Sequence, residues 1–118
     1  MPSRWEQVVV DAEDPPRLAR WWAEALGYVI VDESPDRVEI RRAPSELPAL
    51  LFTPVAGPKT AKNRLHIDVR VGKGDGAWER IVAKSAQLVA AGGRVLTTVD
   101  GHHIVMADPE GNEFCVAA

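Results

Sequence analysis

The side chains best suited to chemistry lie in two short stretches of the second half of the chain. His66 and Asp68 are two residues apart in a segment that alternates polar and apolar residues, and Glu113 and Cys115 have the same spacing near the C-terminus. Successive side chains of a strand point to opposite faces, so each pair shares one face of its strand. Imidazole, carboxylate and thiol groups bind metals and transfer protons. The two pairs are therefore the first residues to consider for chemistry.

The elements that must position these residues follow the same order in both halves of the chain. Alternating or β-branched segments predict strands at residues 5–11, 28–31, 37–42 and 49–55, and again at 64–71, 94–98, 102–107 and 113–116. After its first strand, each half has one amphipathic helix. The first should begin with Asp14 as N-cap and end at Gly27, and the second should begin near Asp75 and end at Gly92-Gly93. The sequence thus predicts a repeated βαβββ order.

The alternation also predicts two kinds of strand face. One face is apolar and should pack under the helices: Val8, Val10, Leu65, Ile67, Val69, Val71, Phe114 and Val116. The other face carries Trp5, Gln7, Val9, Asp11, Arg64, His66, Asp68, Glu113 and Cys115. From the pattern alone, this second face is the solvated side of an antiparallel sheet, which is a common arrangement. The expected helix stripes are Leu18, Trp21, Trp22 and Ala25, and Trp78, Ile81, Val82, Ser85, Leu88 and Val89.

Composition limits the classes of protein to consider. The 118 residues suffice for one domain with a core, and a net charge of -3 with interspersed signs gives no indication of nucleic-acid binding. Cys115 is the only cysteine, so no internal disulfide can form and a reducing compartment suits the chain. No apolar run reaches the length of a membrane span, and the N-terminus lacks the pattern of a signal peptide. We therefore expect a cytoplasmic protein with no membrane partner.

Other reactive residues have simpler interpretations. Cys115 has no surrounding signature of a thiol enzyme, and a free cysteine is commonly a small buried hydrophobe. His102 and His103 are adjacent, so they point to opposite faces of a regular strand and cannot chelate one ion. Lys59 and Lys62, with Arg64, form a basic loop that could meet an anionic group, although a solvated loop is at least as common.

Three motifs carry a resemblance to a known family. They are residues 14–22 (DPPRLARWW) followed by 26–28 (LGY), residues 59–68 (KTAKNRLHID), and residues 108–115 (DPEGNEFC). Together they resemble the vicinal oxygen chelate superfamily, in its glyoxalase-like, bleomycin-resistance-like branch. This resemblance implies an α+β fold with two βαβββ modules, at about 4–56 and 63–118 of a single domain spanning 1–118. The modules would form a curled mixed sheet around a pocket, with the helices outside.

The resemblance also implies where a pocket and a metal would lie. The ligand pocket would be lined by Trp5, Gln7, Phe52, His66, Asp68, Glu113 and Cys115. Metal-dependent members take ligands from four places, which here hold Gln7, Phe52, His66 and Cys115. Phe52 has no donor atom, and Cys115 stands where a carboxylate is usual, so we expect no usual metal site. A divalent metal held by an improvised set of Gln7, His66 and Glu113 is the alternative.

Three function classes follow from the resemblance. The first is a protein that binds a small organic molecule without the usual metal. The second is a lyase, isomerase or dioxygenase that uses an altered metal site or acid/base chemistry at His66 and Glu113. The third is a structural module with a vestigial pocket. Because members of the family often form twofold dimers, a homodimer is expected.

Overall fold

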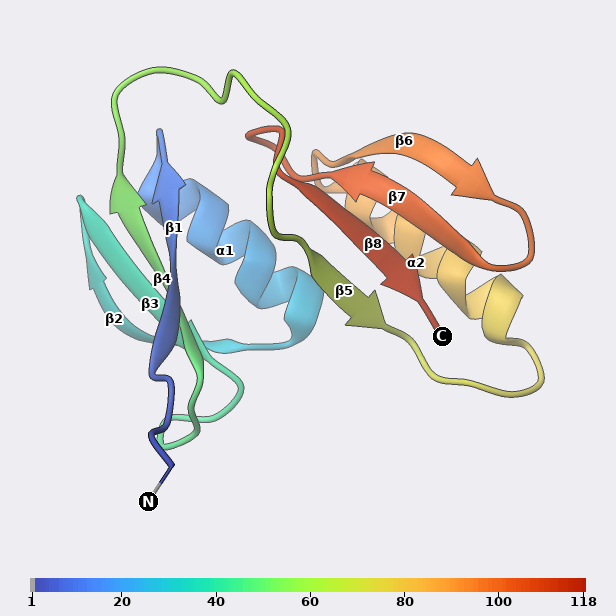
Figure 1. Ribbon diagram of the computed structural model, residues 1–118, viewed down its shortest axis with the longest axis horizontal. Coiled ribbons are helices and arrows are strands. Elements are labelled where there is room, and N and C mark those ends of the chain that lie inside the picture. Colours follow the sequence, from blue (N-terminus) through green and yellow to red (C-terminus); the bar gives the residue numbers. More distant parts are fainter. Residues whose placement is uncertain (1) are drawn as a thin grey trace. The chain divides into compact units, whose positions relative to one another are not determined.

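The chain folds into two compact units with the same order of elements. The computed structural model describes residues 2–118, and the division falls between Pro58 and Lys59. The first unit contains β1 (Gln7–Ala12), α1 (Pro15–Leu26), β2 (Val29–Ser34), β3 (Arg37–Arg41) and β4 (Ala49–Pro54) (Figure 1). The second contains β5 (Ile67–Arg70), α2 (Ala77–Ala90), β6 (Arg94–Val99), β7 (His103–Ala107) and β8 (Glu113–Ala117). The predicted α+β fold of two βαβββ modules is confirmed.

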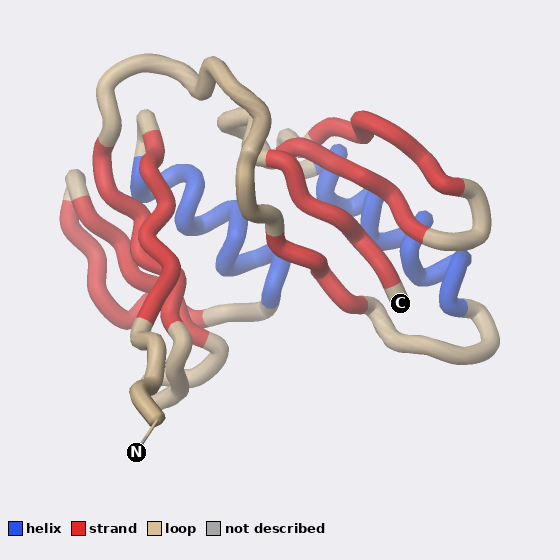
Figure 2. Tube along the Cα trace, in the orientation of Figure 1, coloured by secondary structure: helices blue, strands red, loops and turns tan. Residues whose placement is uncertain are grey.

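Each unit has its own four-stranded mixed sheet with one helix on it. The strand orders are β1-β4-β3-β2 and β5-β8-β7-β6, so the first and last strands of each module are neighbours (Figure 2). These neighbours pair in parallel, and the other pairs are antiparallel. Both β2 and β6 have a register shift, at Ile30/Asp32 and Val95/Thr97. The repeat predicted from the pattern therefore extends to the register of the strands.

The ends of α1 follow local rules. The backbone N–H of Arg17 donates to the Asp14 carboxylate at 3.3 Å, Pro15 occupies the first turn, and Gly27 closes the helix at a left-handed φ of 72°. The N-cap and C-cap predictions for α1 are confirmed. Neither helix of residues 2–118 combines the length and apolar character that a membrane-spanning helix needs.

The start of α2 differs from the prediction. Its N-cap is Gly76 rather than Asp75, and no side chain caps the helix. Instead, the Arg80 guanidinium donates to the carbonyl oxygens of Gly72, Lys73 and Asp75 at 2.9–3.0 Å. Three accepted hydrogen bonds shape this glycine-rich loop, so the side chain that organises the helix start comes from inside the helix.

Each module packs its helix against the buried face of its sheet. In the first, α1 packs against β3 and β4, where Leu18, Val38, Ile40 and Phe52 are fully buried. In the second, α2 packs against β6, β7 and β8, where Ile81, Met106, Phe114 and Val116 are fully buried. These cores provide the main apolar driving force for each module.

Several residues predicted to be inward lie outside. Leu65 is 85% exposed because β5 begins only at Ile67, which leaves Leu65 in the preceding connection. Val8 is exposed because β1 is an edge strand away from the centre of α1 packing. On α2 the predicted stripe is narrower than expected: Ile81, Ser85 and Leu88 are buried, Trp78 is half-buried, and Val82 and Val89 are exposed.

Candidate functional site

The pairing of β5 with β8 brings the predicted site residues of the second module together. Asp68 lies beside Cys115 in this parallel pair, and Val69 lies beside Val116. Neighbouring residues in a pair share a face, so Val69 and Val116 are buried on one side, while Asp68 and Cys115 lie on the other. His66 comes directly before β5, two residues from Asp68. Two strands therefore support one polar cluster.

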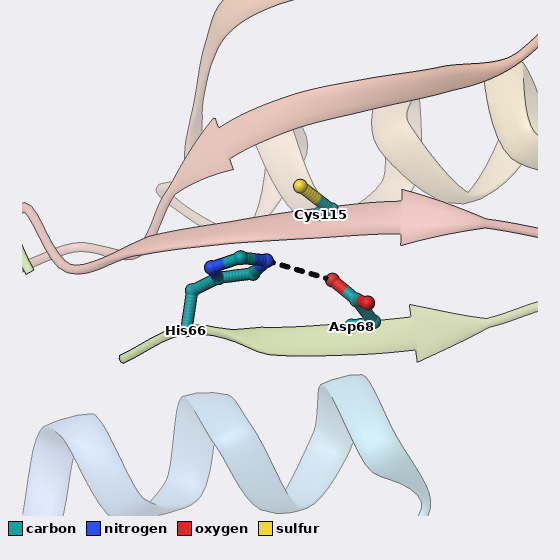
Figure 3. Close-up of side chains that lie close together, drawn as sticks. All are labelled: His66, Asp68 and Cys115. Carbon is teal, nitrogen blue, oxygen red and sulfur yellow. Dashed lines mark ion pairs between the residues drawn. The ribbon is translucent and has the colours of Figure 1, made fainter. Parts of the chain in front are cut away.

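His66, Asp68 and Cys115 form this cluster, and one potential ligand atom from each lies within 4.8 Å of the others. Figure 3 shows the His66 ring beside Asp68, with Cys115 on the neighbouring strand β8. Nε2 of His66 is 3.2 Å from Oδ1 of Asp68, and these side chains are 55% and 66% exposed. Partial burial raises the pKa of the Cys115 thiol, and the nearby Asp68 carboxylate raises it further. At neutral pH the thiol is therefore protonated, which argues against a free thiolate nucleophile.

Glu113 lies on the same strand but is engaged elsewhere. Its carboxylate is 2.9 Å from Nζ of Lys59 and 3.7 Å from Nζ of Lys62, and it accepts the backbone N–H of Asn63 at 3.0 Å. The Asn63 side-chain amide also donates to the Glu113 carbonyl oxygen at 3.2 Å. Glu113 thus fastens residues 59–63 to the start of β8.

These contacts determine the charge of Glu113. The hydrogen bond from Lys59 lowers its pKa from 4.5 to about 2, assisted by the Asn63 N–H and opposed by partial burial. A carboxyl group with this pKa is ionised at neutral pH and has no proton to donate. It is also a weak base, so the geometry supports a structural role for Glu113 over the candidate acid/base role.

The turn before β8 fixes the position of both residues. Asp108 is buried, and its carboxylate accepts the N–H groups of Glu110 and Asn112 at 2.9 and 3.0 Å and the Asn112 side-chain amide at 2.9 Å. The Gly111 N–H closes the turn on the Asp108 carbonyl at 2.9 Å. Asp, Pro and Gly are residues that turns prefer at these positions, and the side-chain hydrogen bonds of Asp108 make this an Asx-type turn.

The first module places its predicted site residues differently. Trp5 precedes β1 and is 63% exposed, whereas Gln7 opens β1, half-buried and paired with Ala49. Phe52 pairs with Val10 and Val38 and is fully buried. Because Gln7 shares its face with Ala49, Phe52 lies on the opposite face, under α1. The prediction that Phe52 lines the same wall as Gln7 is therefore wrong.

The register identifies the residue that takes that place. Cys115 precedes Val116 and pairs with Asp68, and in the first module Leu51 precedes Phe52 and pairs with Val9. Leu51 is thus the counterpart of Cys115. Residue types alone do not indicate this, because Ala49, Leu50, Leu51 and Phe52 are all apolar and buried, so the central strand β4 has no polar alternation.

The donor set does not fit the metal site implied by the resemblance. Leu51 has no donor atom, and Cys115 supplies sulfur where a hard cation needs carboxylate oxygen. The oxygens of Glu113, which the improvised set requires, are held by Lys59, Lys62 and Asn63.

A twice-repeated βαβββ module with a parallel outer pair defines the glyoxalase-like class of folds. The sequence profile described as "Glyoxalase-like domain" matches residues 7–117. The chain belongs to this family, within the vicinal oxygen chelate superfamily. A comparison with curated protein sequences found no match.

Solved structures support the same fold. The chain is similar to a glyoxalase-related enzyme from Fulvimarina pelagi, with a TM-score of 0.72, 19% identity, and coverage of 98% of this chain and 88% of that one. It is also similar to a fosfomycin resistance protein from Listeria monocytogenes, with a TM-score of 0.73, 13% identity, and coverage of 100% and 93%. A glyoxalase/bleomycin resistance protein/dioxygenase family enzyme from Burkholderia phytofirmans has a TM-score of 0.69, 15% identity, and coverage of 94% of each chain. At these identities the likeness establishes the fold alone.

Proposed function

We propose that this glyoxalase-like protein binds a small organic molecule on the sheet face that carries His66, Asp68 and Cys115. The observation that carries the proposal is the convergence of three different polar groups from β5 and β8 on one face, with His66 and Asp68 largely exposed. An imidazole, a carboxylate and a thiol offer donors and acceptors that can orient a ligand.

The arrangement of charge supports binding over the usual metal chemistry of the family. Of the four metal-ligand places implied by the resemblance, one is occupied by Leu51, which has no donor atom. The charge of Glu113 is neutralised by Lys59. Asp68 is the one carboxylate among the three clustered side chains, and its Oδ1 is 3.2 Å from Nε2 of His66. Such a face suits a polar or partly apolar molecule that hydrogen-bonds to His66 and Asp68. The expected homodimer and cytoplasmic location stay predictions.

Acid/base catalysis at His66 is the second candidate function. The Asp68 carboxylate, whose Oδ1 is 3.2 Å from Nε2, would hold the imidazole ring in one orientation. Since Glu113 has a pKa of about 2, it holds no proton to give at neutral pH. A lyase or isomerase mechanism without metal would therefore transfer protons through His66.

The names of the structural neighbours suggest the first ligands to test. One of those proteins is named for fosfomycin resistance and another for bleomycin resistance. Titration of isotope-labelled protein with each compound, and then with a metabolite panel, should move the amide signals of Asp68 and Cys115 most. The titration is run with a chelator present so that metal binding cannot contribute.

Two histidine variants make the test specific. His66→Ala should weaken binding about tenfold, the effect of one lost hydrogen bond of about 1.4 kcal/mol. His102→Ala, in the exposed turn before β7, should bind as the unmodified chain does. Signals that move mainly on α2 or β6, or equal affinity for both variants, would overturn the proposal. Turnover of a panel compound that disappears in His66→Ala would favour the enzyme.

A further inference from the structure

We infer that Lys62 selects ligands that carry an anionic group, and that it binds this group at the edge of the His66–Asp68–Cys115 cluster beside Glu113. Lys62 is 83% exposed, and its Nζ is 3.7 Å from Oε1 of Glu113. This assignment rests on the proposed function, because it names the class of molecule that the same face binds. The sequence shows only that the loop is basic, whereas the structure gives its lysines different roles.

Lys59 is committed to the fold. Its Nζ is 2.9 Å from Oε2 of Glu113, and its side chain is only 23% exposed. The hydrogen bond from Lys59 is the main cause of the lowered pKa of Glu113. One ammonium group therefore already balances this carboxylate, so the positive charge of Lys62 is in excess at the start of β8.

The Lys62 side chain can exchange Glu113 for a ligand at little cost. Exposed ion pairs contribute little to stability, because water competes for both partners and the long side chain loses rotamer freedom. The backbone beside Lys62 is nevertheless held, because the backbone N–H and the side-chain amide of Asn63 donate to Glu113 at 3.0 and 3.2 Å. A held backbone therefore carries a solvated cation whose side chain can turn towards a ligand.

The charge of Lys62 reaches the polar cluster. Glu113 and Cys115 lie on the same face of β8, two residues and therefore about 6–7 Å apart. Burial and the Asp68 carboxylate raise the pKa of the Cys115 thiol, and the Lys62 ammonium lowers it. The thiol therefore lies within the electrostatic reach of two opposite charges, one on β5 and the other on the segment that precedes it.

These two charges give the face a direction along which a ligand can be oriented. Asp68 and His66, with 3.2 Å between Oδ1 and Nε2, provide an end that accepts hydrogen bonds from a hydroxyl or amine group of a ligand. Lys62 provides the end that attracts a carboxylate or another anionic group. Because water screens an exposed lysine, its charge contributes to the choice between ligands more than to total affinity.

Titration of the isotope-labelled full chain with benzoate and with benzamide tests the role of charge. The two compounds have nearly the same shape, and only benzoate is negatively charged at neutral pH. With a chelator present, benzoate should move the amide signals of Lys62, Asp68 and Cys115. It should also bind about fivefold more tightly than benzamide, the upper end of what one exposed ion pair contributes. Added salt should reduce this preference. Equal affinities for the two compounds would overturn the inference.

Lysine variants assign the preference to one side chain. Lys62→Ala should reduce the benzoate affinity to that of benzamide and leave benzamide binding unchanged, which a purely structural role would not do. Lys62→Arg should retain the preference because it keeps the charge. Lys73→Ala removes an equal charge from the exposed loop before α2 and should behave as the unmodified chain, with circular dichroism to confirm that each variant is folded.

The outcomes separate this inference from the proposed function. A preference for benzoate that persists in Lys62→Ala would show that the assignment of Lys62 is wrong. Equal binding of both compounds on the cluster face would overturn the inference and leave the proposed function standing. If neither compound moves these amide signals, the inference is overturned, and the proposed function is decided by its own ligand titration.

Discussion

Removal of the Glu113 charge should destabilise the second module in a pH-dependent way. Lys59, Lys62 and the Asn63 N–H surround this carboxylate, whose side chain is only 13% exposed. We expect Glu113→Gln to lower the free energy of unfolding at pH 7, because the neutral amide cannot pair with Lys59. The Gln side chain can still accept the Asn63 N–H, so the substitution isolates the charge.

The lowered pKa of Glu113 gives the size of its contribution to stability and the direction of its pH dependence. A carboxyl group whose pKa falls from 4.5 to about 2 on folding stabilises the folded state by at most about 3 kcal/mol at pH 7. The ion pair lies near the surface, so solvent screening reduces this to about 1–2 kcal/mol. Since the folded pKa is lowered, the stabilisation is present above pH 4.5 and is lost as the pH falls towards 2.

Urea unfolding followed by circular dichroism measures this effect. The difference between the unmodified chain and Glu113→Gln should shrink by more than half between pH 7 and pH 3. Two lysine variants provide a matched comparison, because Lys59 is 2.9 Å from the carboxylate and 23% exposed, while Lys62 is 3.7 Å away and 83% exposed. Lys59→Ala should cost clearly more than Lys62→Ala. A pH-independent difference for Glu113→Gln, or equal costs for the two lysines, would refute the reasoning.

Three further stability predictions use the same urea measurement at pH 7. Asp108→Ala should cost at least about 2 kcal/mol, because it leaves two turn N–H groups without their acceptor, and a smaller loss would contradict the Asx-type turn. Gly27→Ala should cost about 1 kcal/mol from backbone strain alone, since φ is 72° and no atom lies within 4 Å of an added Cβ; an unchanged midpoint would argue against that conformation. Phe52→Ala should cost about 3–5 kcal/mol and Leu65→Ala less than about 0.5 kcal/mol, and the reverse order would contradict the register and the burial described for β4 and β5.

The fold could be predicted because its signals are local and repeated. Asp14, Pro15 and Gly27 mark the ends of α1 by side-chain chemistry and backbone conformation that act over a few residues. The alternation around Asp68 and Cys115 places both on a polar face, since the opposite face must be apolar to pack under α2. Each such signal depends only on neighbours in sequence and on the strand period.

The wrong predictions, for Phe52 and for the N-cap of α2, fall where these local sequence signals are weak or absent. In β4, apolar residues on both faces remove the alternation, so residue types do not indicate the face on which Phe52 lies. At the start of α2, Asp75 is a reasonable N-cap by residue type, but the long side chain of Arg80 reaches back to organise the loop. In both cases the outcome depends on tertiary contacts, which a short segment of sequence does not reveal.

Two residues of β8, Glu113 and Cys115, show that side chains on the same face of a strand need not have the same role. Glu113 and Cys115 lie on the same face, two residues apart. Cys115 has a strand neighbour, Asp68, whereas β5 begins at Ile67, beside Phe114, so Glu113 has no β5 residue beside it. Asn63, 50 residues away in sequence, instead donates hydrogen bonds to both the carboxylate and the carbonyl oxygen of Glu113. The contacts with Lys59 and Asn63 therefore support an anchoring role for Glu113, whereas Cys115 lies beside Asp68 in the cluster with His66.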